Sequence, residues 1–252
     1  MKRKMLFRWL KVVLLAYGVI GIAVYYGQNR LLLHPEPLPR DEAFTFTQPF
    51  AELNLPYDAE TNLNIIEFKA TDRPADSLAK GIVLYFPDGK GNITTNSGEA
   101  SAFTSRGYEF WIMDYPGFGK STGIFSERNV YAYALEFYKL ARSRWKPSQI
   151  VLCGQGLGTG IAAQLASVRN CRRLILIDAC YSVTSKFRRW LFLYPVSLMV
   201  HYHFPTYQYL PAVTDPITIV GGDRRLKAFL KPWDEFDERG VPFLPDQIGT
   251  TR

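Results

Sequence analysis

Gln149-Ile-Val-Leu-Cys-Gly-Gln-Gly-Leu-Gly-Thr-Gly160 is the stretch that decides the fold of this chain. Its apolar start is typical of a buried strand, and Ile161-Ala-Ala-Gln-Leu-Ala-Ser167 has the spacing of a helix. A strand, a glycine-pinched turn and a helix form the motif G-x-S-x-G, in which a serine lies at the tip of the turn. Here the frame reads Gly154-Gln155-Gly156-Leu157-Gly158, so glycine stands at the serine position. The stretch predicts the backbone of such an elbow without its nucleophile.

Around this turn, short apolar segments alternate with helical ones. We expect strands at 82–86, 109–114, 149–153, 173–178 and 216–220, and helices near 95–106, 127–144 and 160–168. Such alternation predicts an α/β fold with a mostly parallel sheet covered by helices on both faces. The preceding segments 51–57 and 63–68 predict a hairpin at a sheet edge.

Two further motifs establish a resemblance. Asp114-Tyr-Pro-Gly-Phe-Gly-Lys-Ser-Thr-Gly123 is similar to the D-Y-x-G-x-G-x-S-x-G segment of the α/β-hydrolase superfamily, and Gly81-Ile-Val-Leu-Tyr-Phe86 is similar to the strand before its His-Gly oxyanion loop. With the elbow, they make the chain resemble the membrane-anchored, serine-aminopeptidase-like and lysophospholipase-like branch. The resemblance implies an α/β-hydrolase-like domain over 50–252, with a cap insertion near 183–212.

The family's catalytic triad follows the chain order nucleophile, acid, histidine, and this sequence departs from it. Gly156 has no side chain, and the oxyanion loop reads Pro87-Asp88-Gly89. The turn Gly221-Gly222-Asp223 resembles the acid turn, but it runs straight into Arg224-Arg225. The three histidines, at 34, 201 and 203, all precede it, and 224–252 contains neither the family's histidine loop nor, we expect, its terminal helix.

Several coordinated losses favour a decayed or repurposed enzyme, because removing triad members costs several orders of magnitude in rate. We therefore expect a pseudohydrolase with no catalytic residue, cofactor or metal. Its pocket should bind an acyl or peptide-like ligand or a partner. The residues expected at this pocket come from the elbow, the oxyanion loop and the acid turn: Gln155, Gly156, Leu157, Asp88, Gly89 and Asp223. An esterase- or peptidase-like enzyme with displaced catalytic groups remains an alternative.

Other residues carry weaker alternatives. Cys153 and Cys180 are thiols with no histidine predicted beside them, and both fit small buried apolar positions. Ser121, like Ser126, is placed to cap the next helix, and Asp88-Gly is first of all a turn signature.

Two ligand-binding interpretations also remain open. His201-Tyr-His203 has no carboxylate or cysteine close in sequence to complete a metal site. The glycines at 154, 156, 158 and 160, with Asp178 ending the next strand, are similar to a dinucleotide-binding turn. That frame fails at Thr159, which occupies the third glycine position.

The N-terminus predicts a membrane anchor. The formal charge is +7, but residues 1–11 carry five positive charges and the rest is nearly balanced, which argues against a nucleic-acid partner. Residues 12–29 are uncharged and long enough to span a bilayer, and 30–49 is expected to be a proline-rich linker. Basic residues before the span predict a single-pass, uncleaved signal anchor with a cytoplasmic N-terminus and the domain on the periplasmic or lumenal side. Three cysteines exclude a complete disulfide framework.

The segment 186–200 within the cap insertion has two interpretations. It is too short to span a membrane, and Pro195 would kink it. An ordinary buried cap helix is the first interpretation. The second is a lid or a membrane-touching surface, supported by Arg188, Arg189 and Trp190.

Overall fold

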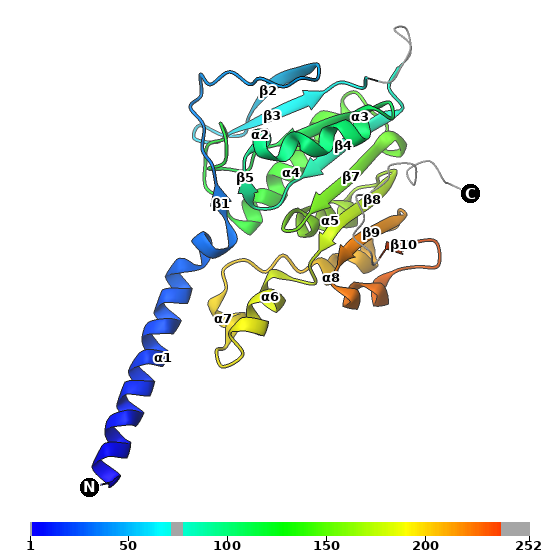
Figure 1. Cartoon of the computed structure of the whole chain (residues 1–252). Coiled ribbons are helices and arrows are strands. Elements are labelled where there is room, and N and C mark those ends of the chain that lie inside the picture. The colour runs from blue at the N-terminus through cyan, green and yellow to red at the C-terminus, as the bar shows by residue number, and fades with distance from the viewer. Residues whose placement is uncertain (1, 72–77, 238–252) are drawn as a thin grey trace.

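The computed structural model describes residues 2–71 and 78–237. Helix α1 (Lys2–Leu32) projects from an α/β domain as a long rod, drawn in blue in Figure 1. Within it, Phe7–Arg30 is long and apolar enough to cross a membrane, and 6% of its best window is buried in the protein. The helix runs beyond both ends of the predicted span of 12–29.

An eight-stranded sheet forms the centre of the domain. Its strands in chain order are β2 (Phe50–Pro56), β3 (Asn62–Phe68), β4 (Gly81–Phe86), β6 (Tyr108–Met113), β7 (Ile150–Gln155), β8 (Arg173–Ala179), β9 (Ile217–Gly222) and β10 (Glu235–Asp237). Their order across the sheet is β10-β9-β8-β7-β4-β6-β3-β2. The β2–β3 and β3–β6 pairs are antiparallel, and the others are parallel. The predicted parallel sheet and edge hairpin are both confirmed.

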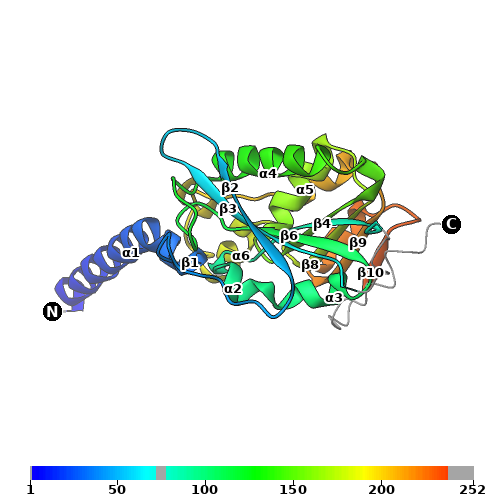
Figure 2. The same cartoon turned by 90° about the horizontal axis from the view of Figure 1, so that it is seen from above.

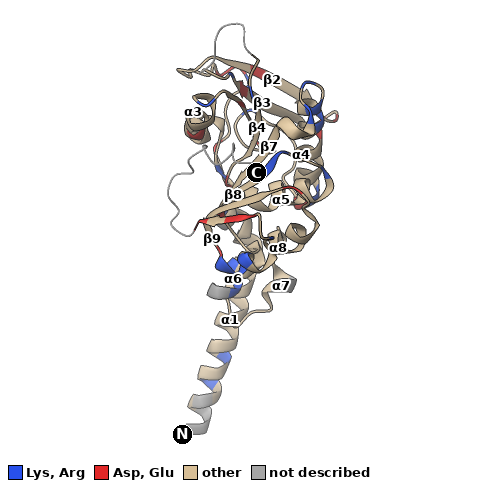
Figure 3. Ribbon diagram, turned by 90° about the vertical axis from the view of Figure 1, so that its right-hand side faces the viewer, with Lys and Arg blue, Asp and Glu red and all other residues tan. Residues whose placement is uncertain are grey.

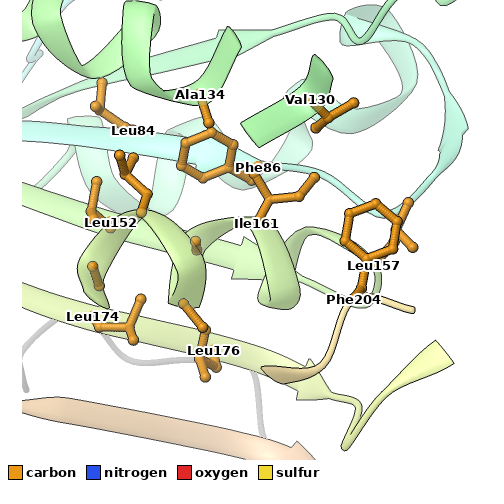
Figure 4. Packing of buried hydrophobic residues seen from close by; sticks show 14 of the residues in the cluster. Leu84, Phe86, Val130, Ala134, Leu152, Leu157, Ile161, Leu174, Leu176 and Phe204 are labelled. Carbon is orange, nitrogen blue, oxygen red and sulfur yellow. The ribbon is translucent and has the colours of Figure 1, made fainter. Parts of the chain in front are cut away.

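Helices cover both faces of this sheet (Figure 2). On one face lie α4 (Glu127–Arg142) and α5 (Gly158–Val168). Figure 4 shows their contact with the sheet, where Leu84, Leu152 and Leu174 are neighbours on β4, β7 and β8 beneath Ile161 and Ala134. These side chains are fully buried, so this apolar layer fixes the height of α5 above the sheet.

The other face differs from the prediction in one respect. Instead of one helix near 95–106, the chain forms α2 (Ile93–Asn96), a 3-10 turn (Ser97–Glu99) and α3 (Ala100–Thr104). The Asn96 amide donates to the carbonyls of Lys90 and Asn92, and Gly98 has low helix propensity. Both effects favour interruption of the helix. Phe103 still packs onto the sheet with Tyr85 and Phe110.

The segment after α1 is held against the domain along much of its length. Strand β1 (His34–Pro35) pairs in parallel with β5 (Lys90–Gly91), and the Leu38 amide donates to the Gly119 carbonyl at 2.8 Å. Helix α1 therefore joins the domain at the loop after β4. The cap consists mainly of three short helices, α6 (Val183–Trp190), α7 (Val196–Met199) and α8 (Thr206–Tyr209). Figures 1 and 3 show α6 and α7 beside α1.

Candidate functional site

The elbow between β7 and α5 has the predicted strand–turn–helix geometry. Gly156 lies at its tip with φ +53° and donates its N–H to the Ile177 carbonyl at 3.0 Å. Close approach explains the flanking glycines. A Cβ at Gly154 would overlap the Gly158 carbonyl, and one at Gly158 would overlap the Phe86 carbonyl. The chain has therefore kept the backbone that presents a nucleophile in hydrolases.

A carboxylate lies where a side chain at the elbow tip would begin. A Cβ added at Gly156 would be 2.6 Å from both Cγ and Oδ1 of Asp88. Asp88 Oδ1 accepts hydrogen bonds from the Leu157 N–H at 2.9 Å and from its neighbour Gly89 at 3.0 Å. The sequence analysis predicts Asp88 and Gly156 at one pocket. No local sequence signal indicated that the two residues lie directly against each other.

The two donors to Asp88 occupy the positions of an oxyanion hole. In this fold the hole is made by the N–H after the nucleophile and by an N–H of the loop after the third strand. Leu157 follows the elbow tip, and Gly89 lies in the loop after β4, the third strand of the sheet in chain order. Both are committed to a carboxylate, and hydrogen bonds to a charged acceptor contribute about 1.5–3 kcal/mol each. A substrate oxyanion would have to displace Asp88 to use them.

The residues that follow α1 cover the same loop. A Cβ at Gly89 would lie 2.9 Å from the side chains of both Leu33 and Leu157. Leu33 and Leu157 are themselves buried, and the His34 N–H donates to the Gly89 carbonyl at 2.8 Å. The oxyanion loop is thus packed between the elbow and the first residues after α1.

Gln155 and Cys180 complete the surroundings of the tip. Gln155 accepts a hydrogen bond from the Tyr85 hydroxyl, and burial raises the pKa of that tyrosine above its usual value. Cys180 Sγ is 3.7 Å from the Gly156 carbonyl. Burial raises the pKa of this thiol, and its other neighbour is the Thr159 hydroxyl at 3.9 Å. A thiol in this environment stays protonated, which argues against Cys180 as a displaced nucleophile. Cys153 is fully buried in the apolar core on the α3 face.

At the end of β9 the acid position contains Asp223, and an arginine is its ion-pair partner. Arg225 Nη2 is 2.6 Å from Asp223 Oδ2, and Arg225 Nε is 2.9 Å from Oδ1. The carboxylate also accepts from the Arg225 N–H at 3.0 Å as the N-cap of a 3-10 helix, Arg224–Phe229. The Arg225 guanidinium in turn lies 4.3 Å from the Tyr181 ring centre. Asp223 therefore organises this turn together with Arg225.

The three histidines make contacts outside the elbow. His34 lies in β1, and the His201 ring packs on Tyr25 of α1 at 4.7 Å. The backbone N–H of His203 donates to Glu127 at 2.6 Å. Within the described residues, no group of three or more His, Cys, Asp or Glu is arranged to hold a metal. The last residues, 238–252, lie outside the described part of the chain.

Two adjoining cavities open beside α6, at the carboxyl ends of β8 and β9. One is about 670 Å³ and lies between α6 and α8, and the other is about 680 Å³ and reaches Cys180 and Asp223. Both are lined by Tyr181, Ser185 and Arg225. Ligands of open α/β sheets bind at this edge of the sheet. Asp178, the acid of the dinucleotide alternative, lines the second cavity with φ +49°.

The motif that begins at Asp114 has a structural role that sequence reasoning missed. Asp114 is 2% exposed, and its loss of hydration raises its pKa to about 7, although backbone N–H groups of Ile93 and Lys120 bind it. Ser121 accepts from the Asn64 N–H and donates to the Asp114 carbonyl, each at 2.8 Å. Ser121 therefore ties this turn to β3, while Ser126 is the cap of α4.

Comparison with known proteins agrees with this geometry. Proteins of the α/β hydrolase fold match residues 86–199. Lysophosphatidylserine lipase ABHD12 of Macaca fascicularis is 30% identical over 187 residues, covering 69% of this chain and 45% of that protein. The same lipase of Bos taurus is 31% identical over 184 residues, covering 69% and 44%. The chain thus spans less than half the length of these relatives.

Solved structures show the same fold at low sequence identity. An α/β hydrolase of Vibrio vulnificus superposes with a TM-score of 0.60 at 16% identity, covering 79% of this chain and 78% of that one. An esterase of Pyrococcus furiosus also gives 0.60, at 12% identity, over 85% of this chain and 95% of its own. The sheet order, the elbow and these matches agree: the chain belongs to the α/β-hydrolase superfamily.

Proposed function

We propose that this protein is a membrane-anchored pseudohydrolase that binds a ligand or partner without triad catalysis. The observation that carries the proposal is the Asp88 carboxylate, which lies against Gly156 and accepts both N–H groups of the oxyanion hole. A nucleophile is absent at the tip. The two N–H groups of the oxyanion hole, whose electrostatic stabilisation usually contributes most to acyl transfer, are already bound to Asp88. α1 anchors the domain, with the N-terminus cytoplasmic and the domain on the periplasmic or lumenal side.

Labelling by a fluorophosphonate probe tests the absence of catalysis. The full chain, purified in detergent micelles, should not be labelled, whereas an active serine hydrolase in the same micelles should be. Gly156→Ser should also remain unlabelled, because the new hydroxyl would meet Asp88 and have no histidine base. Labelling of the native chain at a serine, lost when that serine becomes alanine, would establish the alternative of an esterase- or peptidase-like enzyme with displaced groups.

The two cavities beside α6 support an anionic amphipathic ligand. Lys186, Arg188, Arg224 and Arg225 line them, against the two carboxylates Asp178 and Asp223. The curated relatives are named for lysophosphatidylserine, an acyl lipid with an anionic headgroup. An acyl lipid of this class is therefore favoured over a peptide, with its headgroup among the basic side chains.

Thermal unfolding of the full chain in micelles tests ligand binding. Lysophosphatidylserine should raise the Tm, and lysophosphatidylcholine should raise it less, because binding to the folded state stabilises it. Arg188→Ala should weaken the response to the anionic lipid. Cooperative melting without a shift from either lipid would refute this ligand. A chain that never melts cooperatively would instead be a decayed paralogue.

A further inference from the structure

The cap contacts α1 along one stripe of the helix. Tyr17, Gly21, Tyr25 and Gln28 recur at the spacing of one helix face, and their cap partners lie between residues 193 and 201. We propose that the cap tip, residues 191–196, inserts into the lipid bilayer beside α1 as a second membrane contact. This inference rests on the proposed membrane-spanning role of α1, but not on the loss of catalysis.

The contact is built closely around two tyrosines. The rings of Tyr17 and Tyr194 stack in parallel with centres 4.3 Å apart. The Tyr194 hydroxyl donates to the Tyr17 carbonyl at 2.7 Å, and the Tyr17 hydroxyl donates to the Leu193 carbonyl at 3.0 Å. A Cβ at Gly21 would lie 3.0 Å from the Tyr194 ring, so glycine allows this approach. Both phenols are satisfied within the protein, as the interior of a bilayer requires.

Gln28 makes a second polar contact of the same kind. It is 1% exposed on a helix whose residues are mostly exposed. Its amide donates to the carbonyls of Tyr25 and Met199 and accepts from the His201 N–H at 2.8 Å. A buried polar side chain whose donors and acceptor are all engaged keeps α1 and the cap at a fixed position relative to each other.

This fixed position places the cap tip within the hydrocarbon layer. Tyr17 is 13 positions before Arg30, the end of the apolar span, which is about 20 Å along a helix. The hydrocarbon core of a bilayer is about 30 Å thick. If α1 crosses the membrane, Tyr194 beside Tyr17 lies well below the headgroups, even when the helix is tilted.

The chemistry of the tip fits that location. Residues 190–200 carry no charge, and Phe192 and Leu193 are 77% and 68% exposed. Adjacent exposed side chains of this size in water forgo burial worth about 1.5–3 kcal/mol each. The backbone is partly satisfied within the turn, because Tyr194 N–H donates to the Leu191 carbonyl at 2.9 Å.

Basic residues lie where the tip meets the domain. Lys186 and Arg188 on α6 are exposed, and Figure 3 shows basic residues of α6 beside the upper part of α1. Where the facing leaflet contains anionic lipids, each cation near its surface gains about 1 kcal/mol of attraction. The apolar tip below a basic helix therefore favours a lipid surface over a protein partner.

Site-directed spin labelling tests the inference on the full chain. The native cysteines are all buried, so a nitroxide can be attached to one introduced cysteine. We would compare three exposed apolar positions in vesicles of phosphatidylcholine and phosphatidylserine: Leu193→Cys in the cap tip, Val13→Cys in α1 and Val168→Cys at the end of α5 that points away from the elbow. Relaxation by oxygen marks hydrocarbon, and relaxation by a water-soluble nickel chelate marks the aqueous phase.

We expect labels at 193 and 13 to be relaxed preferentially by oxygen, and the label at 168 by nickel. A label at 193 that resembles 168, while 13 remains in hydrocarbon, would overturn the insertion of the cap. A label at 193 shielded from both reagents would overturn it as well, because protein would then cover the tip. A label at 13 that is relaxed by nickel would refute the membrane anchor itself. Circular dichroism of each labelled chain checks that it has folded.

Discussion

The elbow at the end of β7 and the acid turn at the end of β9 have changed in opposite ways. The elbow keeps its backbone and lacks its side chain, since Gly156 has φ +53° where a nucleophile would stand. The acid turn keeps its side chain, Asp223, but pairs it with Arg225. Core packing enforces the first feature, because α5 lies directly on the sheet. At this one edge of the sheet, the backbone of the fold has therefore been retained while the catalytic side-chain arrangement has not.

Gly156→Ser changes the tip of the elbow and should have the largest effect on stability. A side chain at this φ costs about 1–3 kcal/mol, and the overlap with Asp88 adds about as much, so the free energy of unfolding should fall by about 2–6 kcal/mol. Urea unfolding measures it. Gly117→Ser is the matched control, because Gly117 has φ +81° but open space around its Cβ position.

A second substitution separates the backbone strain at residue 156 from the overlap with Asp88. Asp88→Gly combined with Gly156→Ser should recover at least about 1 kcal/mol relative to Gly156→Ser alone, as expected for residues in contact. Additive losses in this double-mutant cycle would show that Asp88 does not occupy the tip.

Asp114 tests whether the retained family motif now serves stability. Its folded-state pKa is about 7, above the ordinary 3.8, because burial penalises the charged form. The folded protein therefore holds a proton that the unfolded chain releases. The stabilising contribution is full below about pH 4 and is lost as the pH rises to about 7. Asp114→Asn does not titrate, so its stability relative to the native chain should increase over that range by about 2–4 kcal/mol.

The exposed Asp58 is a control of opposite sign. Backbone hydrogen bonding, chiefly from Glu60, lowers its pKa, so its contribution is present above the ordinary pKa and is lost as the pH falls. Asp58→Asn should therefore lose stability relative to the native chain as the pH rises. If Asp114→Asn follows the same trend as Asp58→Asn, the Asp114 side chain is not the buried acid described above.

The contact between α1 and the cap can be broken at Gln28. Gln28→Leu removes the hydrogen bonds of Gln28 to Met199 and His201. The packing of the cap against α1 should therefore weaken by about 1–2 kcal/mol. Trypsin should then cleave the full chain at Lys186 and Arg188 about tenfold faster, since about 1.4 kcal/mol is a factor of ten. Asn29→Leu, at the exposed neighbouring position, should leave cleavage unchanged. Equal rates for both variants would show that Gln28 does not hold the cap.

Features that depend on local pattern were predictable from the sequence. The strand runs, the edge hairpin and the elbow follow from apolar period and glycine spacing, and the strands are found at β2 to β4 and β6 to β9. Strand β10 is only three residues long, which is too short for the sequence to show a period. The interruption of the helix near 95–106 was missed because the Asn96 amide bonds to carbonyls from an adjacent turn.

The site was harder to predict because its contacts join distant segments. Asp88 and Leu157 are 69 positions apart, and a carboxylate beside a glycine in an Asp-Gly turn has many ordinary explanations. The pairing of Asp223 with Arg225 joins residues only two positions apart in one turn, so a local pattern comes closer to predicting it. Contacts between the linker and the loop after β4 had no signal, because two-residue strands show no alternation.

The smallest expected effect is at the acid turn itself. Arg225 is 55% exposed at its side chain, so solvent screens its ion pair, and Arg225→Ala should change unfolding free energy by no more than about 0.5 kcal/mol. Asp223→Ala should cost more, about 1 kcal/mol, because it also removes the N-cap of the 3-10 helix that follows. Thermal unfolding of the two variants, with Arg224→Ala as a neighbouring control, separates capping from ion pairing. If Arg225→Ala were the more damaging change, the arginine would be the structural centre of this turn, and Asp223 would be retained for the ion pair rather than for the cap.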